Sequence, residues 1–169
     1  MEGIALAELV LSRIDNRLIH GQVLVKWTAQ TRADSICIVD DDVAQDAMLI
    51  GLFNMAIPKG TTLEVLTAEE VAGFLSAQKG RALLIFKDIQ HAETALNTGV
   101  PMKKLQVAGL GRREGRVQVY PTVYLSRPDA ECLCKMEQKG VEVYFQALPE
   151  QPIVPLERAL QEHFSSLLK

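Results

Sequence analysis

The sequence predicts an α/β fold: one domain over residues 1–169, with a mostly parallel central sheet of about six or seven strands and helices on both faces. Short apolar runs alternate with amphipathic stretches, which is the pattern of strand–helix–strand units. The chain length of 169 residues, with 48% hydrophobic and 23% charged residues, suits a single core. No repeat or low-complexity segment interrupts the alternation.

Six short apolar runs have the character of strands that are buried on both faces. They are residues 9–14, 35–40, 62–66, 82–86, 105–107 and 141–145. Amphipathic stretches between and after them predict helices over residues 21–30, 44–56, 68–78, 89–97 and 129–139. A last helix is expected from Pro155 to the C-terminus, because its leucines and Phe164 fall on one face. The segment RVQVYPTVYLS, residues 116–126, alternates around Pro121 and predicts an edge strand or a hairpin.

Composition excludes several classes of function. A net charge of -3 and a pI near 5.6 give no general attraction to nucleic acid or to anionic lipid. No apolar stretch approaches the roughly 20 residues of a membrane span, and no secretory signal is present, so we expect a cytoplasmic protein. Cys37, Cys132 and Cys134 lack zinc-site spacing and are interpreted as reduced structural thiols. Neither a metal nor a cofactor is expected.

The loop after the first predicted strand holds the candidate site. Ligands of open α/β sheets bind outside the carboxyl ends of the strands. A helix that starts at Gly21 or Gln22 directs free backbone N–H groups toward this loop, and Arg13 and Arg17 add two cations. Together these groups predict an anion site that contains His20, whose neutral imidazole is a competent nucleophile for a phosphoryl group.

A less specific interpretation of the same residues stays open. A single histidine is most often a packed or surface side chain, and Asp15 paired with Arg17 is also a common loop ion pair. The glycine-rich segment GLGRREG, residues 109–115, does not fit a dinucleotide fingerprint, and no P-loop lysine motif occurs. The residues alone therefore predict a histidine-centred anion site without deciding whether it reacts.

Three segments resemble one protein family. RIDNRLIHGQV, residues 13–23, resembles the phosphorylation-site segment of the IIB components of the mannose/fructose/sorbose family of the bacterial sugar phosphotransferase system (PTS). IVDDDVAQD, residues 38–46, resembles the second strand and acidic loop of that family, and TGVPMKKLQVAGL, residues 98–110, resembles its fifth-strand segment. The resemblance implies an α/β fold with a predominantly parallel sheet, in agreement with the alternation above.

The resemblance also implies a function. His20 would accept a phosphoryl group at Nδ1 from a phosphohistidine of a IIA protein or domain. It would then pass the group to a sugar held by the membrane subunits IIC and IID, so the chain would associate peripherally with that permease complex. The alternative is a non-catalytic anion-binding or regulatory module on the same fold. A homo-oligomer is possible.

Roles for the neighbouring residues follow from this reaction. Arg17 is expected to stabilise charge on the equatorial phosphoryl oxygens. Arg13 either assists or anchors the strand end, and Asp15 orients Arg17 or the imidazole, or forms a structural ion pair. Gly21 and Gln22 are expected to bind the phosphoryl group through the helix N-terminus.

Other features give weaker expectations. Gln106-Val107-Ala108-Gly109 stands where many family members have Asn-Val-Gly-Gly or Asn-Val-Gly-Asn, which predicts a reshaped loop beside the site. Residues 87–101 and 147–156 look most like the N-acetylgalactosamine branch. Clustered carboxylates suit hard cations, but the family's phosphoryl transfer uses no metal on the IIB component. The acidic run Asp40, Asp41 and Asp42 is therefore expected either to serve loop structure, with Asp42 as a helix cap, or to raise the transfer potential of a nearby phosphoryl group. Three further residues are interpreted as structural or, for the tryptophan, as core or docking residues: His91, His163 and Trp27.

Overall fold

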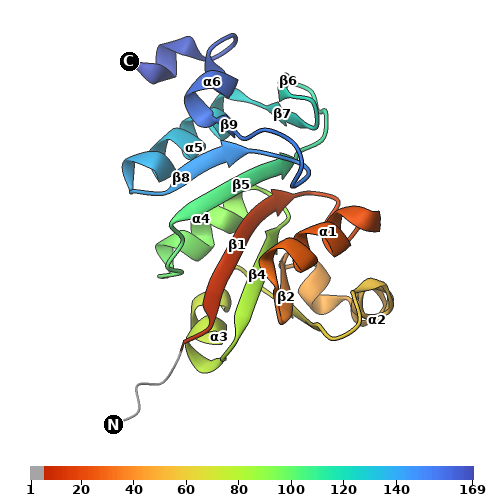
Figure 1. Cartoon of the computed structure of the whole chain (residues 1–169). Coiled ribbons are helices and arrows are strands. Elements are labelled where there is room, and N and C mark those ends of the chain that lie inside the picture. Colours follow the sequence, from red (N-terminus) through yellow and green to blue (C-terminus); the bar gives the residue numbers. More distant parts are fainter. Residues whose placement is uncertain (1–5) are drawn as a thin grey trace.

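A mostly parallel, seven-stranded sheet forms the centre of the molecule (Figure 1). The structure, a computed structural model, describes residues 6–169 apart from the side chain of Gln22. The strand order is β3-β2-β4-β1-β5-β8-β9, and only β9 pairs antiparallel, with β8. The strands are β1 Glu8–Asp15, β2 Ser35–Val39, β3 Thr62–Leu66, β4 Arg81–Phe86, β5 Lys104–Gly109, β8 Glu142–Phe145 and β9 Val154–Pro155. The predicted fold class is confirmed.

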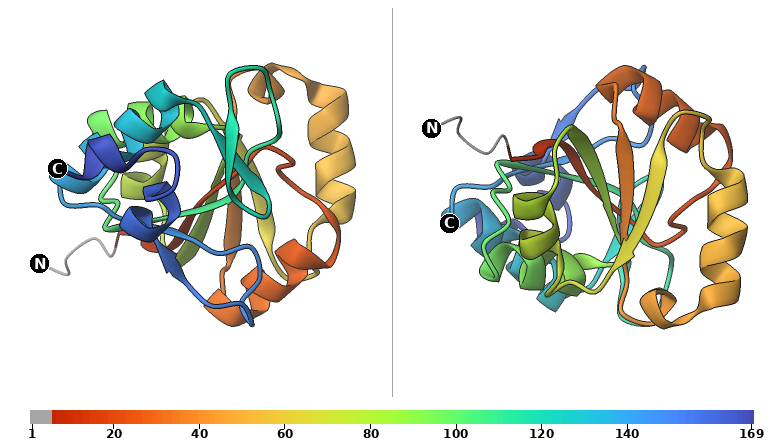
Figure 2. Two further views of the ribbon diagram at one scale, coloured as in Figure 1. Left: turned by 90° about the horizontal axis from the view of Figure 1, so that it is seen from above. Right: turned by 90° about the horizontal axis from the view of Figure 1, so that it is seen from below.

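Helices cover both faces of the sheet (Figure 2). One face carries α1 Gly21–Thr31 and α2 Ala47–Ala56. The other face carries α3 Val71–Ala77, α4 Ile89–Asn97, α5 Arg127–Gln138 and α6 Leu156–Leu160. None of the helices within residues 6–169 combines the length and the apolar composition that a bilayer crossing requires.

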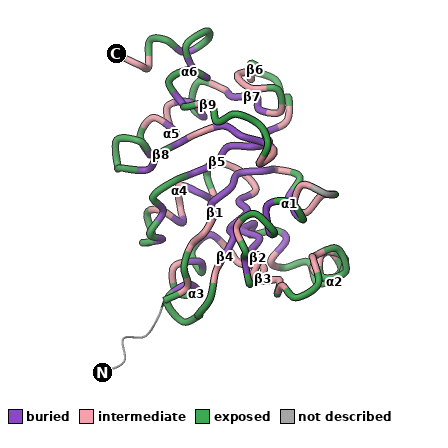
Figure 3. The backbone as a smooth tube through the Cα atoms, in the orientation of Figure 1, coloured by how far each residue is buried: buried purple, intermediate pink, exposed green. Residues whose placement is uncertain are grey.

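The two faces explain why the strands look continuously apolar in the sequence. In β2, Ile36 and Ile38 pack in the core beneath α1 and α2, whereas Cys37 and Val39 pack in the core on the opposite face. Successive side chains of a strand point to opposite sides, so a sheet that is covered twice needs apolar residues at every position. Figure 3 shows this buried centre along the inner strands.

Several predicted helix bounds are wrong. A 3-10 turn, Val43–Gln45, precedes α2, and the Asp46 carboxylate caps α2 by accepting from Leu49 N at 3.0 Å, so Asp42 is not its cap. The last helix ends at Leu160 instead of continuing to the C-terminus. Phe164 leaves helical geometry, with φ −132° and ψ 30°, and buries its ring in the core.

Two further helix starts differ from the prediction, whereas a hairpin agrees with it. The turn in which Glu70 accepts from Thr67 N delays the start of α3 to Val71. Helix α5 begins at Arg127, because Ser126 and Asp129 form a reciprocal capping box. The segment 116–126 is a hairpin of β6 Val117–Tyr120 and β7 Val123–Leu125, as one of the two alternatives predicted.

The chain changes face at β1. It leaves β1 toward α1 on one side of the sheet, whereas the neighbouring strand β4 leads to α4 on the other side. Loops that diverge in this way open a crevice at the carboxyl ends of the strands, where ligands of α/β proteins bind. The loop between Asp15 and Gly21 lies at this point.

We predict that Asp46→Ala lowers the free energy of unfolding by about 1 kcal/mol, because it removes the N-cap of α2. Urea unfolding measures the change. Asp42→Ala is the matched control, since the Asp42 side chain makes no capping bond to the turn that it precedes; we expect it to stay within about 0.5 kcal/mol of the parent. An equal loss in both variants would contradict the assignment.

Candidate functional site

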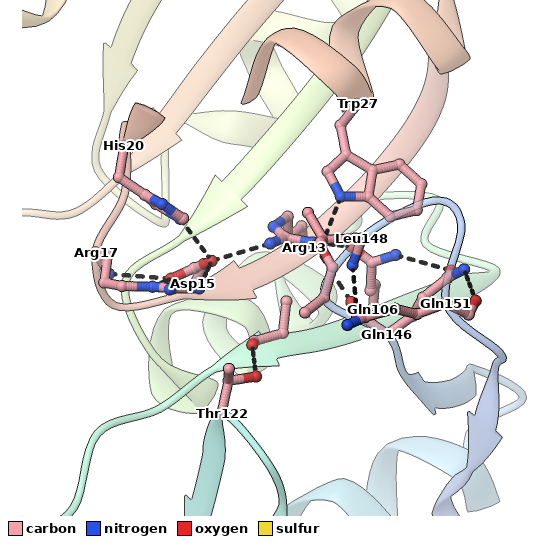
Figure 4. Close-up of polar contacts among 12 residues, drawn as sticks. Arg13, Asp15, Arg17, His20, Trp27, Gln106, Thr122, Gln146, Leu148 and Gln151 are labelled. Carbon is pink, nitrogen blue, oxygen red and sulfur yellow. Dashed lines mark hydrogen bonds and ion pairs between the residues drawn. The ribbon is translucent and has the colours of Figure 1, made fainter. Parts of the chain in front are cut away.

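The buried carboxylate of Asp15, at the end of β1, holds the candidate site together (Figure 4). Its Oδ1 accepts from Arg17 Nε at 2.9 Å and from the Arg17 backbone N–H at 3.2 Å. Its Oδ2 accepts from Arg17 Nη2 at 2.9 Å and from Arg13 Nη2 at 3.0 Å, and lies 3.1 Å from His20 Nε2. The structure therefore brings together four of the predicted site residues.

The electrostatics of Asp15 follow from these contacts. Burial alone would raise the pKa of its carboxyl group. The hydrogen bond from Arg17, the charges of Arg13 and Arg17, and the hydrogen bond from His20 outweigh burial and lower the pKa to about 2. Asp15 is thus ionised at neutral pH, and an ionised carboxylate only accepts hydrogen bonds.

The contact with Asp15 determines the tautomer of His20. Because Asp15 only accepts, Nε2 carries the ring proton and donates it to Oδ2. Nδ1 therefore bears the free lone pair of the neutral ring. His20 lies immediately before α1 in an extended conformation, with φ −148° and ψ 129°, and its side chain is 25% exposed. The arrangement leaves the Nδ1 lone pair free beside the N-terminus of α1.

Gly21, the first residue of α1, has a conformational reason to be glycine. Its φ of +46° is one that residues with a side chain rarely adopt. A Cβ added there would meet nothing within 4 Å among the described atoms, so the backbone angle, rather than crowding within the chain, favours glycine. Gln22 follows it in the first turn, but its side chain lies outside the described residues.

The two arginines occupy different environments. The side chain of Arg17 is 44% exposed beside His20. Arg13 is 3% exposed, and its guanidinium lies 5.7 Å from the ring centre of Trp27. Arg13 Nη1 also donates to Gln106 Oε1 and to Ala147 O. A ligand beside His20 can therefore reach Arg17 but not Arg13.

Sequence reasoning missed residues that reach the site from distant elements. Gly109, at the end of β5, has space for no side chain: a Cβ there would overlap Asp15 Oδ1 and lie 3.1 Å from Arg17 Nη2. Trp27 donates from Nε1 to Ala147 O at 2.9 Å and covers Arg13. The sequence places Gly109 in a loop beside the site, but it does not indicate that this glycine lies against Asp15.

The acidic run after β2, Asp40 to Asp42, forms hydrogen bonds and an ion pair with neighbouring loop residues. Asp40 is buried and pairs with Lys87 at 3.2 Å, and Asp41 accepts from Ala68 N at 3.0 Å. These contacts place two of the three carboxylates in loop structure at the same edge of the sheet. Asp42 takes part in the 3-10 turn through its backbone: its carbonyl oxygen accepts from Gln45 N.

The other two histidines lie in different settings. His91 Nδ1 is 2.7 Å from Asp88 Oδ1, and the hydrogen bond to Asp88 raises the pKa of His91. His163 lies 3.9 Å from Glu162 near the C-terminus. Neither contact reproduces the arginine-bound carboxylate of His20.

The three cysteines are free thiols. Burial raises the pKa of both Cys37 and Cys132 to about 12, and it also raises the pKa of Cys134. These thiols are therefore protonated at neutral pH, where they are weak nucleophiles and weak metal ligands.

Comparison with known proteins gives the family. The family model described as "PTS system sorbose subfamily IIB component" matches residues 9–167. The chain belongs to this family. The N-acetylgalactosamine-specific phosphotransferase enzyme IIB component 2 of Escherichia coli K12 is 31% identical over 154 residues, which cover 90% of this chain and 98% of that protein.

Two further proteins are similar to most of this chain. The mannose-specific EIIAB component of E. coli K12 is 31% identical over 84% of this chain, which spans 45% of that longer protein. The crystal structure of manxB from Thermoanaerobacter tengcongensis is 28% identical, covers 95% of this chain and 99% of that chain, and superposes with a TM-score of 0.89. As a PTS IIB component, this chain belongs to the phosphocarrier proteins of sugar transport.

We predict that Gly109→Ala raises the pKa of Asp15 by about one unit or more, because the added Cβ displaces the carboxylate from Arg17. One unit corresponds to about 1.4 kcal/mol of unfolding free energy. A carboxyl group with a lowered pKa stabilises the fold at pH values above its unfolded-state pKa of about 3.9. The stability that Gly109→Ala loses through Asp15 is therefore greatest at neutral pH, and the difference from the parent protein disappears as the pH falls toward 2.

Carbon-13 NMR titration of the Asp15 carboxyl group and urea unfolding at several pH values measure the two effects. Gly111→Ala is the matched control, because a Cβ at 111 would lie 3.3 Å from only the end of the flexible Asn16 side chain. An unchanged Asp15 pKa in Gly109→Ala would show that the close approach of β5 does not fix this carboxylate.

Proposed function

We propose that this IIB component carries a phosphoryl group on His20 Nδ1. It accepts the group from a phosphohistidine of a IIA partner and gives it to the sugar held by the IIC and IID membrane subunits. The observation that carries the proposal is the 3.1 Å contact between His20 Nε2 and Asp15 Oδ2, which leaves Nδ1 as the free nucleophile. Membership of the IIB family supports the same reaction class.

The transfer balances without loss of a proton from His20. The Nδ1 lone pair forms a bond to phosphorus while the N–P bond of the donor histidine breaks, and its electron pair returns to the donor ring. His20 then carries the phosphoryl group on Nδ1 and a proton on Nε2, so its ring gains positive charge. The carboxylate of Asp15, already bonded to Nε2, stabilises that charge. In the second step the oxygen of a sugar hydroxyl bonds to phosphorus while the P–Nδ1 bond breaks. Nδ1 regains its lone pair, and the hydroxyl proton leaves to water.

Arg17 is the group that we propose for stabilising the transferring oxygens. Two of its nitrogens, Nε and Nη2, bind Asp15, which fixes the plane of the guanidinium. Its Nη1 makes no hydrogen bond to the residues whose side chains are described, and the side chain is 44% exposed. The first backbone N–H groups of α1, at Gly21 and Gln22, add donors for the same oxygens.

The partners and the location follow from this chemistry. Donor and acceptor must reach the same histidine, so we propose that IIA and the membrane subunits use the crevice in alternation. The chain then works in the cytoplasm, at the inner face of the permease. N-acetylgalactosamine is our proposed sugar, supported by the resemblance of residues 87–101 and 147–156 to that branch and by a relative specific for that sugar.

We predict that incubation with phosphoenolpyruvate and the phosphorelay proteins labels His20. The label should be stable in alkali and labile in acid, as a phosphoramidate is. It should be lost in His20→Ala and kept in the matched variants His91→Ala and His163→Ala. Phosphopeptide mapping by mass spectrometry identifies the residue.

Release of the label tests the acceptor. Membranes with an N-acetylgalactosamine IIC and IID pair and that sugar should remove the label, whereas mannose with the same membranes should not. Label retained in His20→Ala would overturn the assignment of the carrier. Release by mannose alone would overturn only the assignment of the sugar.

We predict that Arg17→Ala slows phosphoryl transfer onto and off His20 by about 10²- to 10³-fold, the usual cost of removing one well-placed donor to a developing charge. Arg17→Lys should recover part of this loss, since an ammonium group does not reproduce the two-nitrogen geometry seen on Asp15. Rapid-quench kinetics measure both half-reactions, and thermal unfolding is followed in parallel.

The matched control is Arg112→Ala, an exposed arginine of the β5–β6 loop. It should transfer at the parental rate within about threefold. A parental rate in Arg17→Ala, or a loss that simply follows unfolding, would assign Arg17 a structural role.

A further inference from the structure

A buried guanidinium lies behind the site. Arg13 is 3% exposed, so its charge and its donors have to be compensated inside the protein. Asp15 Oδ2 accepts from Nη2 at 3.0 Å, while Gln106 Oε1 and Ala147 O accept from Nη1. The face of Trp27 covers the group at 5.7 Å. Its own strand β1 and three other segments, β5, α1 and the loop after β8, thus fix the position of Arg13 (Figure 4).

Gln106 connects Arg13 to the loop that follows β8. Its amide oxygen accepts from Arg13, and its amide nitrogen donates to Gln146 Oε1 at 3.4 Å. Gln106 is 0% exposed and Gln146 is 7% exposed, so neither amide can replace its partner with bulk water. Only a side chain that both accepts and donates satisfies the two neighbours at once.

The loop Gln146–Gln151 is itself anchored from two sides. Gln146 Nε2 donates to Gln151 O at 2.8 Å, which closes the loop on itself. Trp27 of α1 donates to Ala147 O at 2.9 Å, and the Tyr120 hydroxyl of the hairpin accepts from Ala147 N at 3.3 Å. The carbonyl of Ala147 therefore stays where it also accepts from Arg13.

We propose that Gln106 is a positioning residue: through Arg13 it holds Asp15 where the carboxylate fixes the Nε2–H tautomer of His20, with the loop Gln146–Gln151 as its anchor. The role in transfer rests on the proposed function, whereas the effect on the tautomer does not. Asp15 Oδ2 accepts from both Arg13 and His20. If Arg13 moves, Oδ2 moves with it and its hydrogen bond to His20 changes. A looser carboxylate allows the Nδ1–H tautomer, in which the nucleophilic lone pair is lost.

The test compares Gln106→Leu with the parent protein. Leucine fills a similar volume but offers neither the acceptor for Arg13 nor the donor for Gln146. Nitrogen-15 NMR of the unphosphorylated His20 ring should show a larger share of the Nδ1–H tautomer. Transfer onto His20 should slow by about tenfold, a typical cost of losing a group that orients a reacting ligand. Gln106→Asn, which keeps an amide, should restore most of both readouts.

Two further variants serve as a surface control and as a substitute in case Gln106→Leu does not fold. Gln138→Leu changes an exposed glutamine at the end of α5, and both readouts should match the parent. If Gln106→Leu does not fold, Gln146→Ala tests the same connection one step further from Arg13. It should shift the tautomer in the same direction by a smaller amount.

An unchanged tautomer in a folded Gln106→Leu would overturn the proposal, even if transfer slows. A shifted tautomer with an unchanged rate would support the positioning of Asp15 by Gln106 and would overturn its role in transfer. If His20 takes no label in the parent protein, the proposed function fails, while the tautomer measurement still decides whether Gln106 positions Asp15.

Discussion

The buried carboxylate of Asp15 is the interaction on which the site depends. It is 0% exposed and stays ionised because two arginines and one histidine donate to it. One negative and two positive charges leave this cluster with a net charge of +1 beside His20, in a chain whose formal charge is -3. The local charge, and not the net charge, is therefore what suits an incoming phosphoryl group.

The fold supplies the positions that this cluster needs. Strand β1 runs between β4 and β5. Its pairing with β4 ends at Ile14, whereas Asp15 pairs with Gly109 of β5. Strand β5 ends at Gly109, whose missing side chain leaves room for the carboxylate. His20, directly before α1, contacts Oδ2 of this carboxylate, whereas Gly109 lies against Oδ1. The parallel sheet is thus the frame that directs three chain segments to one carboxylate.

The sequence predicts part of this site because that part is local. Arg13, Asp15, Arg17 and His20 lie within eight residues, and their chemistry is visible in a single segment. Gln106 and Ala147 contact Arg13 from 93 and 134 residues away, and no local pattern marks a glutamine or a backbone carbonyl as a partner. The helix bounds failed for a related reason: the burial of Phe164 is a tertiary contact that overrides the helical pattern before it.

The alternation of strand side chains separates two arginines that look equivalent in the sequence. Arg13 and Asp15 share the face of β1 that α1 covers, whereas Ile14 between them enters the core on the opposite face. The Arg13 side chain therefore lies between the sheet and Trp27 of α1. Arg17 follows the end of the strand, and its side chain is partly exposed to solvent. The alternation along β1 buries the Arg13 guanidinium and places the Asp15 carboxylate on the same face, next to it. The loop after β1 then brings the Arg17 guanidinium and His20 onto that carboxylate from the solvent side.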